Sequence, residues 1–282
     1  ILKIIFYLFS NNYLTLSFYF SLLTGIKSYG KIDNIKVVIR KRGSDMAGIY
    51  DYEHPFVCTD AVVFRITTQE ADSYRKLPEP KLSVLLYNRP VEPFQGKWCL
   101  PGGFLNIDET PEDNIRRKLA EKSQLMECYL EQLYTFCDVE RDERGRVISI
   151  AYLGLVKESE EKLNGEWFTV NTEGNRLTFE KGSIRLTEED LGFDHYKIIQ
   201  TALERLRAKL RYSDIIFHLL PTEFTLTQVQ NVYEAITGKP EAAANFRRKI
   251  AHMVKETDRY TSDKGHRPAK IFVKNPDWHE QA

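Results

Sequence analysis

The sequence contains little cysteine, and none of it has a metal-binding spacing. The cysteines are Cys58, Cys99, Cys128 and Cys137, and no two of them form a C-x-x-C pair. Zinc ribbons and dithiol redox sites use that spacing, and small disulfide-stabilised domains use many more cysteines for their length. We therefore expect reduced, mostly buried cysteines in a cytoplasmic protein, without a zinc site or a disulfide framework.

The chain also lacks a net charge, internal repeats and low-complexity tracts. Its 40 basic residues balance its 40 acidic residues, so net charge identifies no partner. Partners have to be inferred from where the charges lie along the chain. A length of 282 residues suggests one large domain or two of ordinary size, each able to bury its own core.

An uncharged segment near the start, residues 4–26, raises the question of a membrane anchor. It is long enough to span a bilayer, but asparagine, serine and threonine residues interrupt it and no small-residue cleavage site clearly follows it. The first methionine is Met46, and the codons of residues 40–45 can form a purine-rich ribosome-binding sequence. We expect translation to start at Met46, with residues 1–45 as upstream or non-native sequence, in preference to a membrane anchor. The intact mass of the native protein tests this hypothesis.

Residues 46–212 carry the pattern of a mixed sheet flanked by helices, which predicts an α/β (α+β) fold arranged as an α/β/α sandwich. The strands are expected at residues 56–64, 81–87, 133–139 and 147–156. Thr110 and the proline after it are typical of a helix N-cap and first turn. In that helix, Ile115, Leu119 and Met126 are expected to pack on the sheet.

A spaced motif of glycine, glutamate and arginine covers residues 103–125 and the start of this helix. The segment resembles the Nudix box, G-x5-E-x7-R-E-U-x-E-E-x-G-U, in which U is aliphatic. The residues that match are Gly103, Glu109, Arg117, Leu119, Glu121 and Leu125. The residues that depart from it are Lys118, Lys122 and Gln124, which replace glutamate, glutamate and glycine. We expect a hydrolase scaffold that has lost its chemistry, with the matching residues as remnants of the catalytic box.

The departures fall on the metal-binding face of the helix. The carboxylates of a Nudix box share one face and hold hard divalent cations, usually magnesium, that neutralise a pyrophosphate. Here Glu121 lies between Lys118 and Lys122, so the formal charge of the face changes from −3 to +1. We expect no metal cofactor, with Glu121 as the remaining weak candidate ligand. Magnesium would be required only if the chain were an active hydrolase.

A long amphipathic helix over residues 195–211, with Asp194 as its expected N-cap, connects this region to the next. We place the domain boundary near Tyr212. Residues 213–282 then carry three helical patterns and a hairpin pattern, at 215–220, 225–236, 241–253 and 259–273. This order predicts a winged helix-turn-helix domain.

The third of these helices has one apolar face and one basic face. Phe246, Ile250 and Met253 repeat at helical spacing and are expected to face the core. The predicted DNA contacts on the helix and on the wing are Asn245, Arg247, Arg248, Lys249, His252, Lys264 and Arg267. Arginine and asparagine can read guanine and adenine with two hydrogen bonds, and flanking cations suit phosphates. An ordinary solvated helix face is the alternative, but together with the helix order the pattern favours binding to double-stranded DNA.

Both regions together resemble the Nudix-related transcriptional regulators of the NrtR type over residues 46–275. The stretches that carry the resemblance are residues 96–104, 141–147, 191–195, 224–227, 245–250 and 266–269. The resemblance implies a homodimeric bacterial repressor that binds operator DNA and senses a metabolite with its Nudix domain. Members of this family are associated with NAD metabolism, often with ADP-ribose as effector, and others with sugar utilisation. The implied effector is ADP-ribose, a related nucleotide or a sugar phosphate.

The effector cleft is expected over the box and the strands that lead into it. The candidates for phosphate or ribose contacts are Arg89, Lys97, Lys118, Lys122, Arg141 and Arg144. Arginine matches phosphate geometry with two hydrogen bonds, although each of these residues alone is also consistent with an ordinary surface charge. Lys118 and Lys122 have two interpretations: ammonium groups that bind a phosphate directly, or drift after catalysis was lost.

Two other functions remain open. An active ADP-ribose or nucleotide-sugar pyrophosphatase with an appended winged helix would need Glu109, Glu112 and Glu121 to assemble a displaced metal site. An enzyme-derived interaction module would have the same fold without DNA binding. Magnesium-dependent turnover of ADP-ribose identifies the first alternative, and the absence of a salt-dependent gel shift identifies the second.

Overall fold

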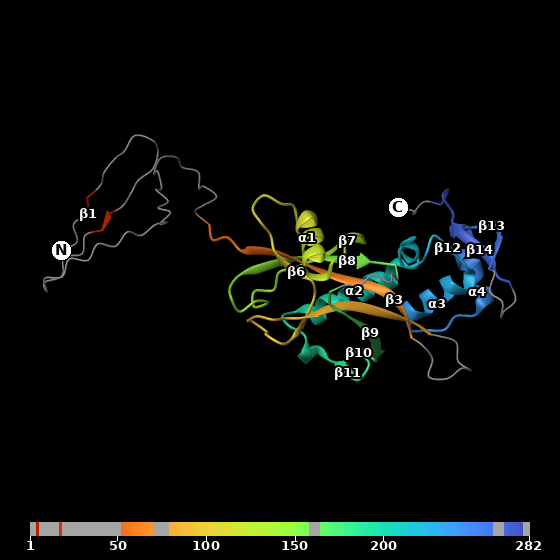
Figure 1. Cartoon of the computed structure of the whole chain (residues 1–282), viewed down its shortest axis with the longest axis horizontal. Helices are drawn as coiled ribbons and strands as arrows, with labels where there is room; N and C mark the ends of the chain where they lie inside the picture. Colours follow the sequence, from red (N-terminus) through yellow and green to blue (C-terminus); the bar gives the residue numbers. More distant parts are fainter. Residues whose placement is uncertain are drawn as a thin grey trace. The chain divides into compact units, whose positions relative to one another are not determined.

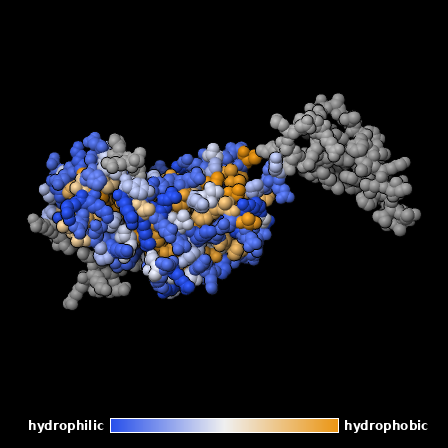
Figure 2. Space-filling view, turned by 180° about the vertical axis from the view of Figure 1, so that it is seen from behind, coloured by the Kyte–Doolittle hydropathy of each residue, from blue (hydrophilic) through white to orange (hydrophobic). Residues whose placement is uncertain are grey.

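The computed structural model describes residues 4–5, 17–18, 52–69, 79–157, 164–261 and 268–278. Near the start of the chain, β1 (Ile4–Ile5) pairs antiparallel with β2 (Ser17–Phe18). The hypotheses about residues 1–45 and Met46 otherwise lie outside the described residues. Among the residues that are described, no helix is long and apolar enough to cross a membrane. The face seen in Figure 2 is mostly hydrophilic, with scattered apolar areas.

A mixed sheet is the centre of residues 54–282 (Figure 1). Its strands are β3 Phe56–Gln69, β4 Glu79–Asn88, β5 Trp98–Cys99, β6 Gly102–Phe104, β7 Tyr129–Phe136, β8 Val147–Leu155, β9 Glu166–Glu173, β10 Arg176–Lys181 and β11 Ile184–Leu186. The order is β11-β10-β9-β4-β3-β8-β7, and β5 and β6 pair with β4 and β3. Because β3 and β8 are parallel while β3 and β4 are antiparallel, the predicted mixed sheet is confirmed.

The central strand β3 is apolar on both faces because a helix covers each of them. Val62 and Phe64 belong to the cluster that contains the buried face of α2 (His195–Lys209). Ala61 and Val63 belong to the cluster on the opposite side, under α1 (Pro111–Ser123). Side chains alternate between the two faces of a strand, so this uninterrupted apolar run forms the middle layer of the predicted sandwich.

Helix α1 begins where the sequence predicts. The Thr110 hydroxyl accepts a hydrogen bond from the Asp113 N–H, and the Asp113 carboxylate accepts one from the Thr110 N–H. These reciprocal bonds satisfy backbone donors that have no partner inside the helix. Ile115 and Leu119 are buried against the sheet, as expected.

The prediction for Met126 is wrong. Its side chain is 76 % exposed, because the helix ends at Ser123 and the next residue, Gln124, takes a left-handed conformation with φ 57°. This turn shifts the apolar pattern, so Leu125 is the residue that enters the core. A left-handed C-cap is usually a glycine, as in the Nudix box, and Gln124 takes that conformation here without being one.

The end of the chain has the order of a winged helix, with two corrections. The elements are η3 Ile215–Leu219, β12 Glu223–Phe224, α3 Leu226–Thr237, α4 Ala243–Ile250, η4 Ala251–Met253, β13 Val254–Tyr260 and β14 Lys270–Lys274. The helix expected at 215–220 is a short 3-10 turn, since Pro221 keeps the residue before it extended. The third helix is shorter than expected and ends in a second 3-10 turn. The predicted hairpin forms as β13 and β14, and β12 adds a third strand.

One hydrophobic cluster continues across the predicted domain boundary near Tyr212. That residue lies between α2 and η3. Phe217 of η3 and Val229 of α3 belong to the same buried cluster as Phe64 of β3, and α3 also packs against β4. Residues 54–282 therefore form one compact unit, in which the sheet and the winged helix share a core.

Candidate functional site

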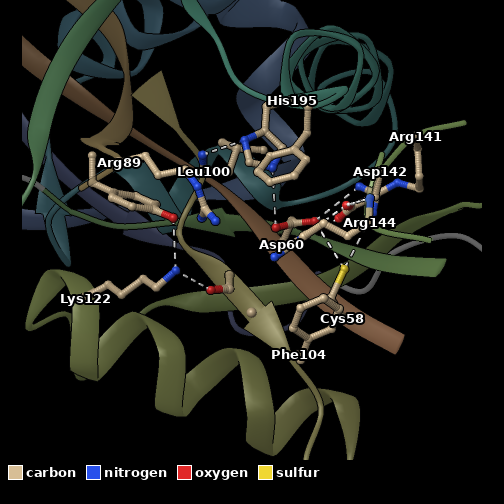
Figure 3. A pocket seen from close by; sticks show the side chains of 14 residues that line it. Cys58, Asp60, Arg89, Leu100, Phe104, Lys122, Arg141, Asp142, Arg144 and His195 are labelled. Carbon is tan, nitrogen blue, oxygen red and sulfur yellow. Dashed lines mark hydrogen bonds and ion pairs between the residues drawn. The ribbon is translucent and has the colours of Figure 1, made fainter. Parts of the chain in front are cut away.

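A cleft of about 160 Å³ opens where β3, β4, β6 and α1 meet (Figure 3). Its charged and titratable lining includes Asp60, Arg89, Lys122, Arg141, Asp142, Arg144 and His195. The structure thus brings together four of the six predicted effector contacts. Lys97 and Lys118 are not among the lining residues.

Two glycines of β6 allow the strand to form the floor of the cleft. A Cβ atom on Gly102 would lie 2.2 Å from the Thr59 carbonyl oxygen and 2.3 Å from Oδ1 of Asp60. A Cβ atom on Gly103 would lie 2.8 Å from Cε of Lys118. At Gly102 only glycine permits this approach, because the neighbour is backbone, whereas at Gly103 the flexible Lys118 side chain could move aside. Strand β6 thus lies close to Asp60 on one side and to α1 on the other.

Arg141 is buried in an ion-pair network on one side of the cleft. Its guanidinium donates to both carboxylate oxygens of Asp194, with Nη2–Oδ1 at 2.7 Å and Nε–Oδ2 at 3.1 Å. Nη2 also lies 3.6 Å from Oδ2 of Asp60, and the Arg141 side chain is only 3 % exposed. Asp194 is the N-cap residue of α2, as predicted, but its carboxylate binds Arg141 and makes no capping hydrogen bond.

Asp60 lies below the cleft in the middle of β3. Its Oδ2 accepts a hydrogen bond from the Ser149 hydroxyl at 2.6 Å. Burial raises the pKa of this carboxyl, but hydrogen bonds from His195 and Ser149 and the charge of Arg141 outweigh burial and lower the pKa to about 2. Asp60 is thus a buried group that is ionised at neutral pH and anchors the network.

His195 completes the network from the first turn of α2. The Leu100 N–H donates to its Nδ1 at 3.0 Å, and its Nε2 lies 3.6 Å from Oδ1 of Asp60. Burial lowers the pKa of His195, and the neighbouring Asp60 carboxylate acts in the opposite direction. Because Nδ1 accepts the hydrogen bond from the Leu100 N–H, this nitrogen carries no proton of its own. We therefore assign the neutral imidazole, with its single proton on Nε2 facing Asp60.

The depressed pKa of Asp60 predicts a pH-dependent stability. The ionised carboxylate stabilises the fold above the ordinary pKa of 3.8, and this contribution is lost as the pH falls toward the folded-state pKa of about 2. Between about pH 5 and pH 2, we expect the wild type to lose about 2 kcal/mol more unfolding free energy than Asp60→Asn. Urea unfolding at a series of pH values measures this difference. Parallel pH profiles for the two proteins would contradict it.

Arg144 stands at the mouth of the cleft beside two aromatic rings. It donates to both oxygens of Asp142, with Nε–Oδ1 at 2.9 Å and Nη2–Oδ2 at 2.7 Å. Its guanidinium lies 5.2 Å from the Phe104 ring and 5.6 Å from the Phe193 ring. Unlike Arg141, its side chain is 41 % exposed, so it remains accessible to a ligand.

Arg89 lines the opposite side, while Lys97 turns away. Nε of Arg89 donates to the Pro93 carbonyl at 2.5 Å, and its guanidinium lies 5.2 Å from the Phe193 ring. Lys97 instead donates from Nζ to the Glu189 carbonyl at 2.6 Å. The loop between β4 and β5 thus directs one of its two cations into the cleft.

The remaining acids of the Nudix box are held by arginine and lysine. Arg117 donates to Glu109 at 2.6 Å and to Glu121 at 2.9 Å. Lys118 donates to the other oxygen of Glu121 at 2.9 Å. The hydrogen bonds from Lys118 and Arg117 are the largest causes that lower the pKa of Glu121. Glu121 is thus an ionised carboxylate already bound by two cations.

This arrangement does not fit a magnesium site. Magnesium needs several oxygen ligands in near-octahedral geometry, whereas Glu121 has ammonium and guanidinium neighbours. Nζ of Lys122 lies 2.5 Å from the Gly102 carbonyl and 3.0 Å from the Tyr87 hydroxyl. Within the ranges that the structure describes, no three His, Cys, Asp or Glu residues are grouped as metal ligands.

The predicted DNA-contacting face is exposed on α4. Phe246 and Ile250 are buried, while Asn245, Arg247 and Arg248 are exposed. Nη2 of Arg248 donates to Oδ1 of Asn245 at 2.5 Å, which aligns two side chains able to read bases. The helix therefore has the predicted orientation, with its apolar side inward.

Two other predicted DNA contacts, Lys249 and His252, differ in whether their side chains already have partners in the protein. Lys249 donates to the Tyr233 hydroxyl at 2.5 Å and lies 3.4 Å from Glu241, so its ammonium is partly neutralised. His252 is exposed in η4, where Asn275 binds its carbonyl oxygen. Lys264 and Arg267 lie outside the described residues, and their assignment to the wing stays a prediction.

Sequence reasoning missed Asp60, Tyr87 and Phe193 as parts of the cleft. The sequence contains one indication of Asp60: it is an isolated acid within the apolar strand 56–64, where a buried charge needs a partner. The sequence contains no such indication for Tyr87 and Phe193, because an aromatic residue is common at a strand end or in a loop.

Comparisons with known proteins identify a domain in each of the two regions predicted from the sequence. The NUDIX domain matches residues 76–198, and the NrtR DNA-binding winged helix domain matches residues 216–273. The chain is 30 % identical over 234 residues to the ADPR responsive transcriptional repressor NtrR of Acinetobacter baylyi. That similarity covers 79 % of this chain and 83 % of the relative.

Two solved structures are similar over most of the chain. NrtR of Shewanella oneidensis, complexed with a 27mer DNA, has a TM-score of 0.57 and 32 % identity, covering 78 % of this chain and 94 % of that one. A MutT/nudix family protein from Enterococcus faecalis has a TM-score of 0.68 and 27 % identity, covering 81 % of this chain and 90 % of that one. The predicted Nudix fold and winged helix are thereby confirmed.

Proposed function

Because the chain belongs to the NrtR family of transcriptional regulators, we propose that it is a cytoplasmic, homodimeric repressor released from operator DNA by ADP-ribose. The observation that carries this proposal is the pairing, in one compact unit, of a cation-rich Nudix cleft with a winged helix whose Asn245 and Arg248 are exposed. ADP-ribose binds in the cleft, and the α4 face binds double-stranded DNA.

The chemistry of the cleft supports a nucleotide diphosphate as effector. Four cations line it, and the rings of Phe104 and Phe193 stand beside Arg144 at its mouth. Cations suit phosphate oxygens, and aromatic faces suit a base or a sugar. The Acinetobacter baylyi relative is named as a repressor responsive to ADPR, which favours ADP-ribose over other nucleotides and sugar phosphates.

We further propose that the protein binds its effector without a metal cofactor and without hydrolysing it. An active pyrophosphatase would need Glu109, Glu112 and Glu121 as ligands, and each is engaged by an arginine. Arg117 holds Glu109 and Glu121, and Arg116 holds Glu112 at 2.8 Å. The hydrolase alternative is therefore the weaker one.

Coupling between cleft and DNA is supported by Arg207 of α2. Its Nε donates to the Ile236 carbonyl at the end of α3 at 2.9 Å, and its Nη2 donates to Thr172 of β9 at 3.1 Å. β9 pairs with β4, the strand that leads to Arg89. A shift of β4 on effector binding thus reaches the winged helix through contiguous contacts. In a homodimer, such a shift changes the spacing of two recognition helices that must meet the major groove about one turn apart.

The experiment that tests the function measures release and turnover together. Fluorescence anisotropy with labelled DNA from upstream of the protein's own gene gives operator affinity with and without ADP-ribose, and chromatography of the same samples detects hydrolysis. We expect ADP-ribose to weaken binding about 5- to 150-fold while remaining intact. Adenosine and ribose 5-phosphate serve as controls. Release only after ADP-ribose is cleaved would establish the hydrolase alternative.

Restoring the box predicts a gain of metal binding. Lys118→Glu with Lys122→Glu places two carboxylates beside Glu121, so that three again share one helix face. We expect magnesium binding detectable by calorimetry, and slow ADP-ribose hydrolysis, because hard oxygen ligands are again grouped. Each single variant is the matched control and should bind magnesium less well. Magnesium-dependent turnover by the wild type that Glu121→Gln abolishes would contradict the assignment.

A further inference from the structure

The last turn of α1 directs Lys122 to the wall of the effector cleft (Figure 3). Its Nζ lies 2.5 Å from the Gly102 carbonyl oxygen and 3.0 Å from the Tyr87 hydroxyl. It also lies 4.6 Å from the centre of the Tyr87 ring. A Nudix box has a glutamate at this position. An ammonium group therefore occupies the part of the helix from which a hydrolase holds its metal.

The four cations of the cleft fall into two classes. Arg141 and Arg144 form ion pairs with Asp194 and Asp142. Arg89 and Lys122, in contrast, form hydrogen bonds only with neutral oxygens of the described residues. These two cations therefore retain positive charge that no bound carboxylate neutralises, and both stand beside the Tyr87 hydroxyl.

The same three residues also border a second, larger pocket. Tyr87, Arg89 and Lys122 line the cleft of about 160 Å³ and an adjoining open pocket of about 500 Å³. The second pocket carries Trp98 and Val91 on its wall. A ligand that lies across both pockets would place its middle against Lys122 and Arg89 and its two ends in the two cavities.

We propose that Lys122 and Arg89, with the Tyr87 hydroxyl, form a metal-free subsite for the diphosphate of an elongated ligand with a sugar or nucleoside at each end. Lys122 supplies the positive charge that a divalent cation supplies in a hydrolase. This inference rests on the proposed function and adds to it the residues that replace the metal. Charge-assisted hydrogen bonds to phosphate oxygens supply the affinity.

The state of Lys122 is consistent with this role. Burial lowers the pKa of its ammonium, the charge of Asp60 partly opposes this, and the charge of Arg89 lowers the pKa further. A bound diphosphate relieves both lowering effects, since it brings negative charge to a partly desolvated cation. Lys118, one turn earlier, lacks these features, because its ammonium pairs with Glu121 at 2.9 Å and does not line the cleft.

The test is calorimetric titration of the full chain with ADP-ribose, in magnesium and in EDTA. We expect equal wild-type affinity in both buffers. Lys122→Met should weaken binding roughly tenfold to a hundredfold, as for a lost charged hydrogen bond. Lys118→Met is the matched control on the same helix and should change affinity less than about threefold. Lys122→Arg should keep most of the affinity, which separates loss of charge from loss of folding.

The outcomes distinguish this inference from the proposed function. Wild-type binding that requires magnesium, or equal affinities of Lys122→Met and Lys118→Met, would overturn the subsite while leaving an ADP-ribose-responsive repressor intact. Failure of ADP-ribose to bind, together with Lys122-dependent binding of inorganic pyrophosphate, would leave the subsite and overturn the effector. Adenosine, which lacks the diphosphate, should bind all four proteins with the same low affinity, and a loss caused by Lys122→Met would count against the subsite.

Discussion

Replacing Arg141 with methionine is expected to lower the free energy of unfolding by about 3–5 kcal/mol. The guanidinium is 3 % exposed and binds Asp194 at 2.7 Å, with Asp60 3.6 Å away. Removing it leaves two largely buried carboxylates without their shared cation, and an isolated buried charge is costly. Urea denaturation followed by circular dichroism measures the change.

Arg144→Met is the matched control for that experiment. Arg144 also makes a bidentate pair, with Asp142, but its own side chain is 41 % exposed. The Asp142 carboxylate is buried, but it keeps its hydrogen bond from the Arg144 backbone N–H, so we expect a smaller loss of about 1–2 kcal/mol. Adding Asp194→Asn to Arg141→Met should recover part of the loss, because one unpaired charge disappears. Equal losses from Arg141→Met and Arg144→Met would contradict the buried network.

Replacing Arg248 with alanine is expected to weaken operator binding by about 1–3 kcal/mol, or roughly 5- to 150-fold, and to relax base preference. Arg248 is exposed on α4, and its hydrogen bond with Asn245 at 2.5 Å aligns the two side chains. A side chain that reads a base edge loses affinity mainly for the correct sequence. Anisotropy titrations against the operator and a panel of single-base variants measure both effects.

Arg247→Ala is the comparison on the same helix. It is exposed beside the base-reading face and is expected to contact phosphates. Its loss should weaken binding to all sequences alike and reduce the slope of affinity against salt by about one unit. Lys249→Ala should have a smaller effect, since Tyr233 and Glu241 already hold its ammonium. Equal, sequence-independent losses from Arg247→Ala and Arg248→Ala would mean that the helix is oriented differently on DNA.

Local patterns in the sequence predicted most of the fold. Thr110 and the proline after it define the start of α1 without distant contacts, and the spacing of Phe246 and Ile250 orients α4 by helix geometry alone. The Nudix box also spans neighbouring residues, so Lys118 and Lys122 were recognisable as departures from it. The prediction for Met126 failed where a left-handed residue changed the helical phase.

The arrangement of the cleft depends on contacts that no local pattern encodes. Arg141 and Asp194 are far apart in the chain, yet they form a buried ion pair, so the carboxylate of the N-cap residue Asp194 binds Arg141 instead of the first turn of α2. Lys97 was a candidate effector contact and Lys249 a candidate DNA contact, but the Glu189 carbonyl and the Tyr233 hydroxyl accept their hydrogen bonds in the fold. A side chain's partner decides whether its charge is available, and partners distant in sequence are visible only in three dimensions.

The most direct test of the account is whether cleft and operator are reciprocally coupled. ADP-ribose is titrated by calorimetry into the free protein and into the protein saturated with operator DNA, and operator affinity is measured in parallel with and without ADP-ribose. Thermodynamic linkage requires DNA to weaken effector binding by the same factor by which the effector weakens DNA binding. We predict equal factors of about 5 to 150. Tight ADP-ribose binding with an affinity that operator DNA leaves unchanged would contradict the account, since cleft and winged helix would then act independently.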